Sequence, residues 1–350
     1  MTNPNGNSPE PITPISRSSF SLQRYLPQDA SITRLFIIML VVFVLMAGIS
    51  PNTFLSLDSF TSMSFQFPVF GIFAFAMMLS MISGGIDLSI VGIANLTSII
   101  AASVMVRMLP AEASASESLL YILLGVAAAL IVGLVCGLFN GFAITKIGIP
   151  PILVTLGTMQ LFMGIAIIVT KGQAIVGLPE LYTKIGNGSL WIFPVPLLMF
   201  CLCILGTYVL LNKQSYGMKL QMLGANPTAS VFSGVNNTRV LLTTYAISGV
   251  LAAIAGLVIV AQTNSAKADY GTSYILQAIL VAVMGGVDPR GGFGKIAGIV
   301  MAVLTLQFLS SGLNALHVGN FFKDFMWGIV LLLVMVINEW SNRRKVRSIS

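Results

Sequence analysis

The sequence predicts an all-α polytopic membrane protein with about ten transmembrane helices, one short helix outside the bilayer and both termini in the cytoplasm. Hydrophobic residues make up 56% of its 350 residues and charged residues only 8%, whereas a soluble domain carries roughly 25% charged residues. The mean hydropathy is +0.93. Because so little charge is available to cover a soluble globule, lipid is the expected solvent.

Ten apolar runs recur along the chain, each close to the ~20 residues that a helix needs to cross a bilayer. Helices are expected because they satisfy their own backbone groups, and the runs are too long and too uniformly apolar for the alternating strands of a barrel. The eighth run is short, and its ends are poorly defined. The predicted spans are 33–49, 62–82, 88–106, 119–139, 151–170, 193–211, 240–261, 274–287, 295–313 and 321–338.

The Lys and Arg residues orient these spans. If the N-terminus is inside, the inner segments hold 13 of the 18 basic residues and the outer segments hold 5, a bias that favours cytoplasmic termini. Residues 1–32 are polar and proline-rich and are expected to form a disordered cytoplasmic tail, not a signal peptide. Residues 33–340 form the membrane domain, followed by a basic cytoplasmic tail, 341–350.

A short helix is predicted within the segment 220–235, between the sixth and seventh spans. Asn226 can cap it, Pro227 suits its first position, and Gly234 is a stop signal. About two helical turns are too few for stability in water, so the helix needs a packing partner. Three basic residues place it on the cytoplasmic side: Lys213, Lys219 and Arg239.

The apolar side chains of this helix are predicted to form one stripe, made by Thr228, Val231, Phe232 and Val235 at helical spacing. Two interpretations are open: the stripe packs on the chain's own membrane domain, or it docks on a cytoplasmic partner. The chain has no phosphate-binding G-x-x-x-x-G-K-[ST] loop, and Gly294-Lys295 lacks its other elements. If ATP drives this protein, another chain must bind the nucleotide.

Asp87 follows Gly84-Gly85 at the start of the third span. It is predicted to cap that helix by accepting the amide hydrogens of Ser89 or Ile90. The glycine break is also a candidate hinge between helices that move against each other during transport. The two roles are compatible. GGVD at residues 285–288 repeats the motif at the inner end of another span.

Several amide side chains lie in or at the ends of spans, where contact with lipid is costly. Each is expected to face other helices, as interhelical glue, or a path for a hydroxyl-rich solute. They are Gln66, Asn95, Asn140, Gln160, Gln307 and Asn314.

Other functional classes have little support. Cys136, Cys201 and Cys203 all lie in apolar runs, no Cys/His set has metal-ligand spacing, and no catalytic constellation or cofactor motif is present, so neither a metal site nor an enzyme is predicted. The basic residues are scattered singly, which argues against nucleic-acid binding. An ion-coupled secondary transporter stays as the alternative, but it would carry ionisable residues deep in its spans.

Four segments together resemble the permease subunits of bacterial ATP-binding cassette (ABC) importers for simple sugars, the ribose, xylose, arabinose, galactose and autoinducer-2 class. The resemblance runs from about residue 35 to the end of the last span. GGIDLS followed by GANP is its most specific feature. The segments are SGGIDLSIVGIANL (83–96), IPPILVTLGTMQLFMGIAIIVTKG (149–172), YGMKLQMLGANPTASVFSGV (216–235) and GGFGKIAGIVMAVLTLQFLSSGLNAL (291–316).

The resemblance implies that the segment 220–235 holds a coupling helix, which sits in a cleft of a separate cytoplasmic ATP-binding subunit. It also implies a second permease copy or paralogue, a periplasmic sugar-binding protein, and the bacterial inner membrane as the location. Permeases for branched-chain amino acids or nucleosides are the alternatives within the class. The implied coupling residues are Lys219, Gly224, Ala225, Asn226, Pro227, Ala229, Val231, Phe232 and Gly234.

Overall fold

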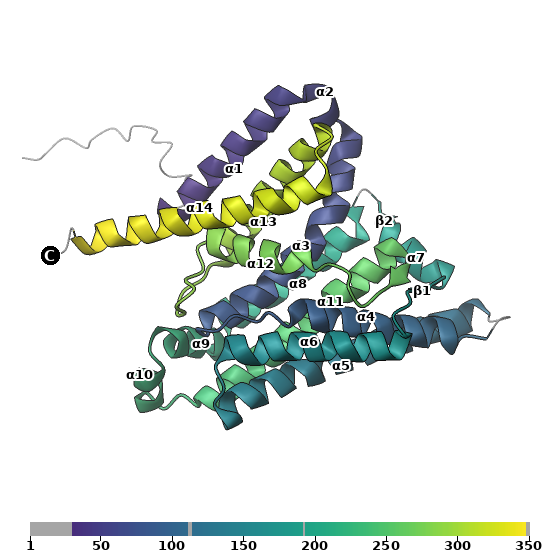
Figure 1. The fold of residues 1–350 in the computed structure, drawn as a ribbon, viewed down its shortest axis with the longest axis horizontal. Coiled ribbons are helices and arrows are strands. Elements are labelled where there is room, and N and C mark those ends of the chain that lie inside the picture. Colours follow the sequence, from purple (N-terminus) through teal and green to yellow (C-terminus); the bar gives the residue numbers. More distant parts are fainter. Residues whose placement is uncertain (1–29, 111–113, 192, 348–350) are drawn as a thin grey trace, which may run out of the picture.

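The computed structural model describes residues 30–110, 114–191 and 193–347, and these are mostly helical (Figure 1). Of the predicted tails 1–32 and 341–350, residues 1–29 and 348–350 lie outside the described residues, whereas 30–32 belong to α1 and 341–347 continue α14, so the predicted tail boundaries are wrong there. The helices are α1 Ala30–Ile49, α2 Pro51–Phe54, α3 Leu57–Ile82, α4 Ile90–Arg107, α5 Ala115–Phe142, α6 Pro151–Thr170, α7 Glu180–Asn187, α8 Val195–Tyr208, α9 Ser215–Ala225, α10 Pro227–Phe232, α11 Asn237–Thr263, α12 Ser273–Met284, α13 Ile296–Ala315 and α14 Asn320–Arg347.

Each predicted span coincides with one of these helices, which confirms the all-α polytopic class. Eight helices in the described part of the chain are long and apolar enough to cross a membrane: α1, α3, α4, α5, α6, α8, α11 and α13. The predicted eighth span is α12, which has only 12 residues, and the tenth lies within α14. Two spanning helices are extended by π-helical turns, η2 (Ala143–Ile147) after α5 and η3 (Val209–Lys213) after α8.

Helices α3 and α11 form the centre of the domain. Most of α3 is buried, and α11 packs against α3, α4 and α5. Figure 1 shows α1, α13 and α14 on one side of α3 and α4, α5 and α6 on the other. The outer helices α1, α5, α6 and α8 leave most of their apolar surface uncovered, as expected for helices that face lipid.

Small residues set the distance between α5 and α11. A Cβ on Gly133 would lie 2.6 Å from the Gly249 carbonyl oxygen, and a Cβ on Gly137 would overlap the Tyr245 carbonyl oxygen. The α5 glycines therefore allow the two helices to pack closely. Backbones can approach this closely only where side chains are small.

Short elements close the end of the bundle opposite α10. Strands β1 (Ile175–Val176) and β4 (Ser265–Ala266) pair antiparallel, as do β2 (Ser189–Leu190) and β3 (Phe193–Pro194). Helix α7 is fixed to α11 by the Tyr182 hydroxyl, which donates to the Leu257 carbonyl at 2.8 Å. These contacts hold the loops over the ends of the spanning helices.

Gly137→Ala should destabilise the protein because the added methyl group must push α5 away from the α11 backbone. Overpacking of this kind costs about 1–3 kcal/mol. Gly206→Ala on α8 is the matched control, since nothing lies within 4 Å of its added Cβ. Thermal unfolding in detergent should show a lower midpoint for Gly137→Ala and an unchanged or higher one for Gly206→Ala. Equal midpoints would contradict the packing described.

Candidate functional site

Helix α10 is a single short helix held at both ends by polar contacts. Asn226 caps it by accepting the Ala229 amide hydrogen at 3.0 Å, and Pro227 occupies the first position, both as predicted. Ser230 donates to the Asn237 side chain at 2.7 Å, and Asn237 donates to the Pro227 carbonyl at 2.9 Å. These bonds fasten α10 to the start of α11.

The outer face of α10 is exposed and largely apolar. The side chain of Phe232 is 88% exposed and that of Val231 57%, and Thr228 and Ala229 are exposed beside them. Val235 is buried, so the predicted four-residue stripe is wrong at this position. The helix ends at Phe232, and the left-handed backbone of Gly234 (φ 79°) turns the chain so that Val235 points inward.

The three exposed residues of the stripe, Thr228, Val231 and Phe232, do not pack on the membrane domain, a question that the sequence alone left open. Ser230 is the α10 residue that is buried, and it faces α11 through Asn237. Exposed clusters of apolar side chains on a structure of this kind mark interaction sites.

Backbone contacts join the end of α9, directly before α10, to the end of α3. A Cβ on Gly224 would overlap the Ile82 carbonyl oxygen and the Gly292 amide nitrogen. The Gly292 amide donates to that same carbonyl at 2.8 Å. Gly292 has φ 84°, and a Cβ there would lie 2.9 Å from the Ala225 Cβ. Three segments far apart in the sequence thus meet through glycines, and we call this contact the glycine junction. Lys219 lies on the exposed side of α9.

Asp87 lies in the turn that follows the glycine junction, and its side chain is fully buried. One carboxylate oxygen accepts the amide and hydroxyl hydrogens of Ser89 at 3.1 and 2.6 Å, and the other accepts the Ser248 hydroxyl at 2.7 Å. The predicted bond to the Ser89 amide is confirmed, but the predicted capping role is wrong, because α4 begins at Ile90 with Ser89 as its N-cap and Asp87 lies in the turn before it. The link to α11 through Ser248 could not be expected from the sequence.

The turn around Asp87 is fixed on three sides. Asn140 of α5 donates to the Ser89 hydroxyl at 2.7 Å, and Thr155 of α6 donates to the Ile86 carbonyl at 2.9 Å. A Cβ on Gly85 would lie 2.6 Å from the Tyr245 hydroxyl oxygen. Gly84 adopts φ 86°, a conformation that only glycine takes readily. The Gly84-Gly85 break is therefore a packed crossing point of four helices.

The repeated GGVD motif has a different local structure. The left-handed glycine is the first of the pair at Gly84 but the second at Gly286 (φ 82°). Asp288 is only partly buried and accepts the backbone amide of Arg290 within its own loop, at 2.9 Å. The two motifs share three of four residues and a bond from the Asp to the amide two residues later, but only Asp87 also binds another helix, through Ser248.

A polar cavity of about 530 Å³ lies at the end of the bundle away from α10, between α3, α11, α12, α13 and α14. It brings together three of the six amides singled out from the sequence. Gln307 donates to Ser311 at 3.0 Å and to Gln66 at 3.5 Å, and Lys323 donates to Asn314. The lining residues are Gln66, Phe70, Ile259, Gln262, Thr263, Tyr270, Gly271, Ser273, Tyr274, Gln277, Gln307, Ser310, Asn314, Lys323, Asp324 and Trp327.

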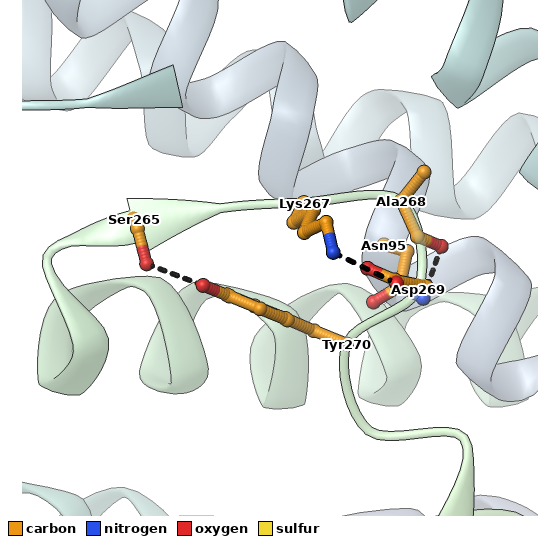
Figure 2. Close-up of polar contacts among 6 residues, drawn as sticks. All are labelled: Asn95, Ser265, Lys267, Ala268, Asp269 and Tyr270. Atoms are coloured by element: carbon orange, nitrogen blue, oxygen red, sulfur yellow. Dashed lines mark hydrogen bonds and ion pairs between the residues drawn. The ribbon is translucent and has the colours of Figure 1, made fainter. Parts of the chain in front are cut away.

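The loop beside this cavity is tied down by side chains (Figure 2). Asn95 of α4 donates to the Ala268 carbonyl at 2.8 Å, and Lys267 pairs with Asp269 at 2.9 Å. The hydroxyls of Ser265 and Tyr270 lie 2.8 Å apart, which positions the Tyr270 ring at the cavity wall. Asn95 thus fastens α4 to this loop by a hydrogen bond.

The other predicted amides lie elsewhere. Asn140 belongs to the Asp87 turn. The prediction is wrong for Gln160, which faces neither another helix nor the cavity, because it lies on the exposed outer side of α6. Gln277 was missed, although an amide inside the eighth predicted span was the same signal. Gln262 was missed because it falls one residue beyond the seventh predicted span. Among the residues that the structure describes, no three His, Cys, Asp or Glu side chains group as a metal site requires.

Comparison with known proteins decides the family. A family model described as "Branched-chain amino acid transport system / permease component" matches residues 59–335. The chain belongs to this permease family. The permease is 30% identical over 328 residues to the autoinducer 2 import system permease protein LsrD of Yersinia pseudotuberculosis serotype O:3 (strain YPIII), covering 89% of this chain and 95% of the relative. LsrD of Yersinia pestis (strain Pestoides F) matches with the same identity and coverage. No solved structure matches the permease significantly.

These matches confirm the class predicted from the motifs. The permease is a non-catalytic membrane subunit of an ABC importer, and ATPase activity belongs to a separate subunit. The alternative of an ion-coupled secondary transporter is not favoured.

Gly224→Ala should separate α9 from the end of α3, because the added methyl group meets backbone atoms that cannot move aside. Gly294→Ala is the matched control, since the atoms nearest its added Cβ belong to the side chains of Ile82 and Val287 and not to the backbone. Trypsin should then cleave after the exposed Lys219 faster in Gly224→Ala than in wild type, because α9 opens more often. Cleavage at the control rate would contradict the glycine junction.

Proposed function

We propose that α10 is the surface through which the permease couples to its cytoplasmic ATP-binding subunit. The observation that carries this proposal is the 88% exposure of Phe232 on a six-residue helix that projects from the bundle. A large apolar side chain in that position loses its contact with water only when a partner covers it. Of the other coupling residues proposed from the sequence, Ala225, Asn226, Pro227, Ala229 and Val231 are exposed as well, whereas Gly224 is buried in the glycine junction and does not belong to this surface.

We further propose that the α10 end faces the cytoplasm of a bacterium and that the protein resides in the inner membrane. The start of α1 and the end of α14 lie on the same side as α10 (Figure 1), in agreement with the bias in basic residues. This orientation places the polar cavity at the periplasmic end, where a binding protein would deliver solute. A second permease copy or paralogue completes the transporter.

The proposed solute is a monosaccharide or a similar small polar molecule. Its support is the similarity to proteins named for autoinducer 2 import together with the sequence motifs of the sugar class. The description of the family model names branched-chain amino acids, and a nucleoside is a third alternative.

The arrangement of buried charge supports an ATP-driven rather than an ion-coupled mechanism. Among the side chains that the structure describes, Asp87 and Lys323 are the charged ones that are buried. Asp87 is fully engaged by Ser89 and Ser248 and is not a lining residue of the cavity. A coupling ion would need a buried acidic group on the solute path, and the acidic side chain that lines the cavity, Asp324, is exposed.

Phe232→Glu should abolish co-purification of the ATP-binding subunit. An unpaired charge buried in the interface costs several kcal/mol, and each 1.4 kcal/mol weakens binding about tenfold. Ala229→Glu should act in the same way. Both side chains are exposed in the permease itself, so membrane yield and thermal stability should stay at the wild-type level.

Ser189→Glu is the control, because Ser189 is exposed at the opposite end of the bundle. It should retain the ATP-binding subunit. Normal yield with full co-purification and uptake in both α10 variants would refute the coupling role of α10. Loss of yield in those variants would show instead that α10 stabilises its own domain.

A further inference from the structure

The polar cavity reaches into the part of the protein that lies in the membrane. Gln307 is eight residues from the end of α13, which places it about 12 Å inside that end at 1.5 Å per residue. Ten of the sixteen lining residues carry an amide or a hydroxyl group. Such groups are costly next to lipid, so they indicate a path or site for a polar molecule.

Several of these groups are available to a ligand. Within the described residues, the Gln277 amide and the hydroxyls of Ser273, Tyr274 and Ser310 form no hydrogen bond with the protein. Gln307 uses its NH₂ group for Ser311 and Gln66, which leaves its carbonyl oxygen free to accept. Neutral donors and acceptors therefore face the cavity from both α12 and α13.

Aromatic rings form part of the same wall. Phe70 and Trp327 are buried residues of the lining, and Tyr274 packs against Phe73 with ring centroids 5.7 Å apart. Fixed apolar faces beside neutral hydrogen-bonding groups suit a molecule that has C–H faces and a rim of hydroxyls. The cavity volume of about 530 Å³ lies in the usual range for small-ligand sites, roughly 300–1,000 Å³.

We propose that this cavity binds a small polyhydroxylated solute of monosaccharide size, with Gln277, Gln307 and Ser310 as hydrogen-bonding residues. The inference rests on the proposed transport function and assigns its solute site. On the side toward α10 the cavity is closed, because α3 is almost fully buried from Ile72 to Ile82. Solute in this conformation therefore enters and leaves at the end away from α10.

A branched-chain amino acid would require a different site. Its ammonium and carboxylate groups need opposite charges, and its side chain needs an apolar wall. The two charged lining residues are neighbours on α14, Asp324 is exposed, and Lys323 already donates to Asn314. Amides and hydroxyls outnumber charges ten to two in the lining, which favours the polyhydroxylated solute.

The test uses the purified transporter complex with one cysteine in the cavity. Ser310→Cys changes only one atom, and Cys136→Ala, Cys201→Ser and Cys203→Ala remove the native thiols. A maleimide should label the cysteine at position 310. Saturating D-ribose, D-xylose or D-galactose should lower the rate of labelling at least about tenfold. L-Leucine should have no effect.

Gln277→Leu in the same background should weaken this protection about tenfold, the effect of losing one or two good hydrogen bonds. Gln160→Leu is the matched control, since Gln160 is exposed on α6 away from the cavity. It should leave protection and uptake unchanged, and both variants should retain the ATP-binding subunit.

Three results would overturn the inference: protection by L-leucine alone, no protection by any of the three sugars, or equal protection in Gln277→Leu and wild type. Failure of the coupling proposal has a separate signature. In that case the ATP-binding subunit would still co-purify with the Phe232→Glu variant, while protection of position 310 by sugar would be unaffected.

Discussion

The contact of Gly224 with the end of α3 is the constraint on which the rest of the site depends. The backbones of α9, α3 and the loop before α13 approach so closely there that a single methyl group would meet the Ile82 carbonyl and the Gly292 amide. Because α10 follows directly after α9, this contact fixes where the exposed face of Phe232 lies. It also fixes the start of the turn that carries Asp87.

Helix α3 connects this contact to the cavity. Gln66 and Phe70 line the cavity, and Ile82 at the other end belongs to the glycine junction, about 24 Å away along the helix. Between them the helix is buried on all sides, so a displacement at one end must be carried as a rigid shift or absorbed at Gly84-Gly85. Packed interiors resist continuous deformation, which suits a helix that links a coupling surface to a solute site.

The spans could be predicted from the sequence because their length and apolarity are set by the bilayer and not by tertiary contacts. The predicted ends of the spans were less accurate. Helix α3 begins at Leu57, five residues before the predicted span, because its first turns are polar and Ser56 caps them. The start of α10 was predicted correctly from Asn226-Pro227. The predicted apolar stripe of α10 was wrong at Val235. The helical spacing of apolar residues continues in the sequence to Val235, but the helix itself ends before Gly234, where the chain turns.

The site depended on contacts that no local pattern reveals. The sequence placed Asp87 correctly at a helix boundary, but its burial requires Ser248, 161 residues later. The amides Gln66, Gln307 and Asn314 were each noticed as costly in lipid. That they share one cavity while Asn95 and Asn140 fasten loops follows only from the packing of five helices.

The proposed contact between the exposed face of α10 and an ATP-binding subunit can be tested by photo-crosslinking from position 232 in intact cells. A benzophenone amino acid replaces Phe232, and mass spectrometry identifies the product. A crosslink to an ATP-binding subunit is expected at position 232 and none at Trp191, which is 94% exposed near the opposite end of the bundle. A crosslink at position 232 only to the permease itself or to lipid would refute the contact.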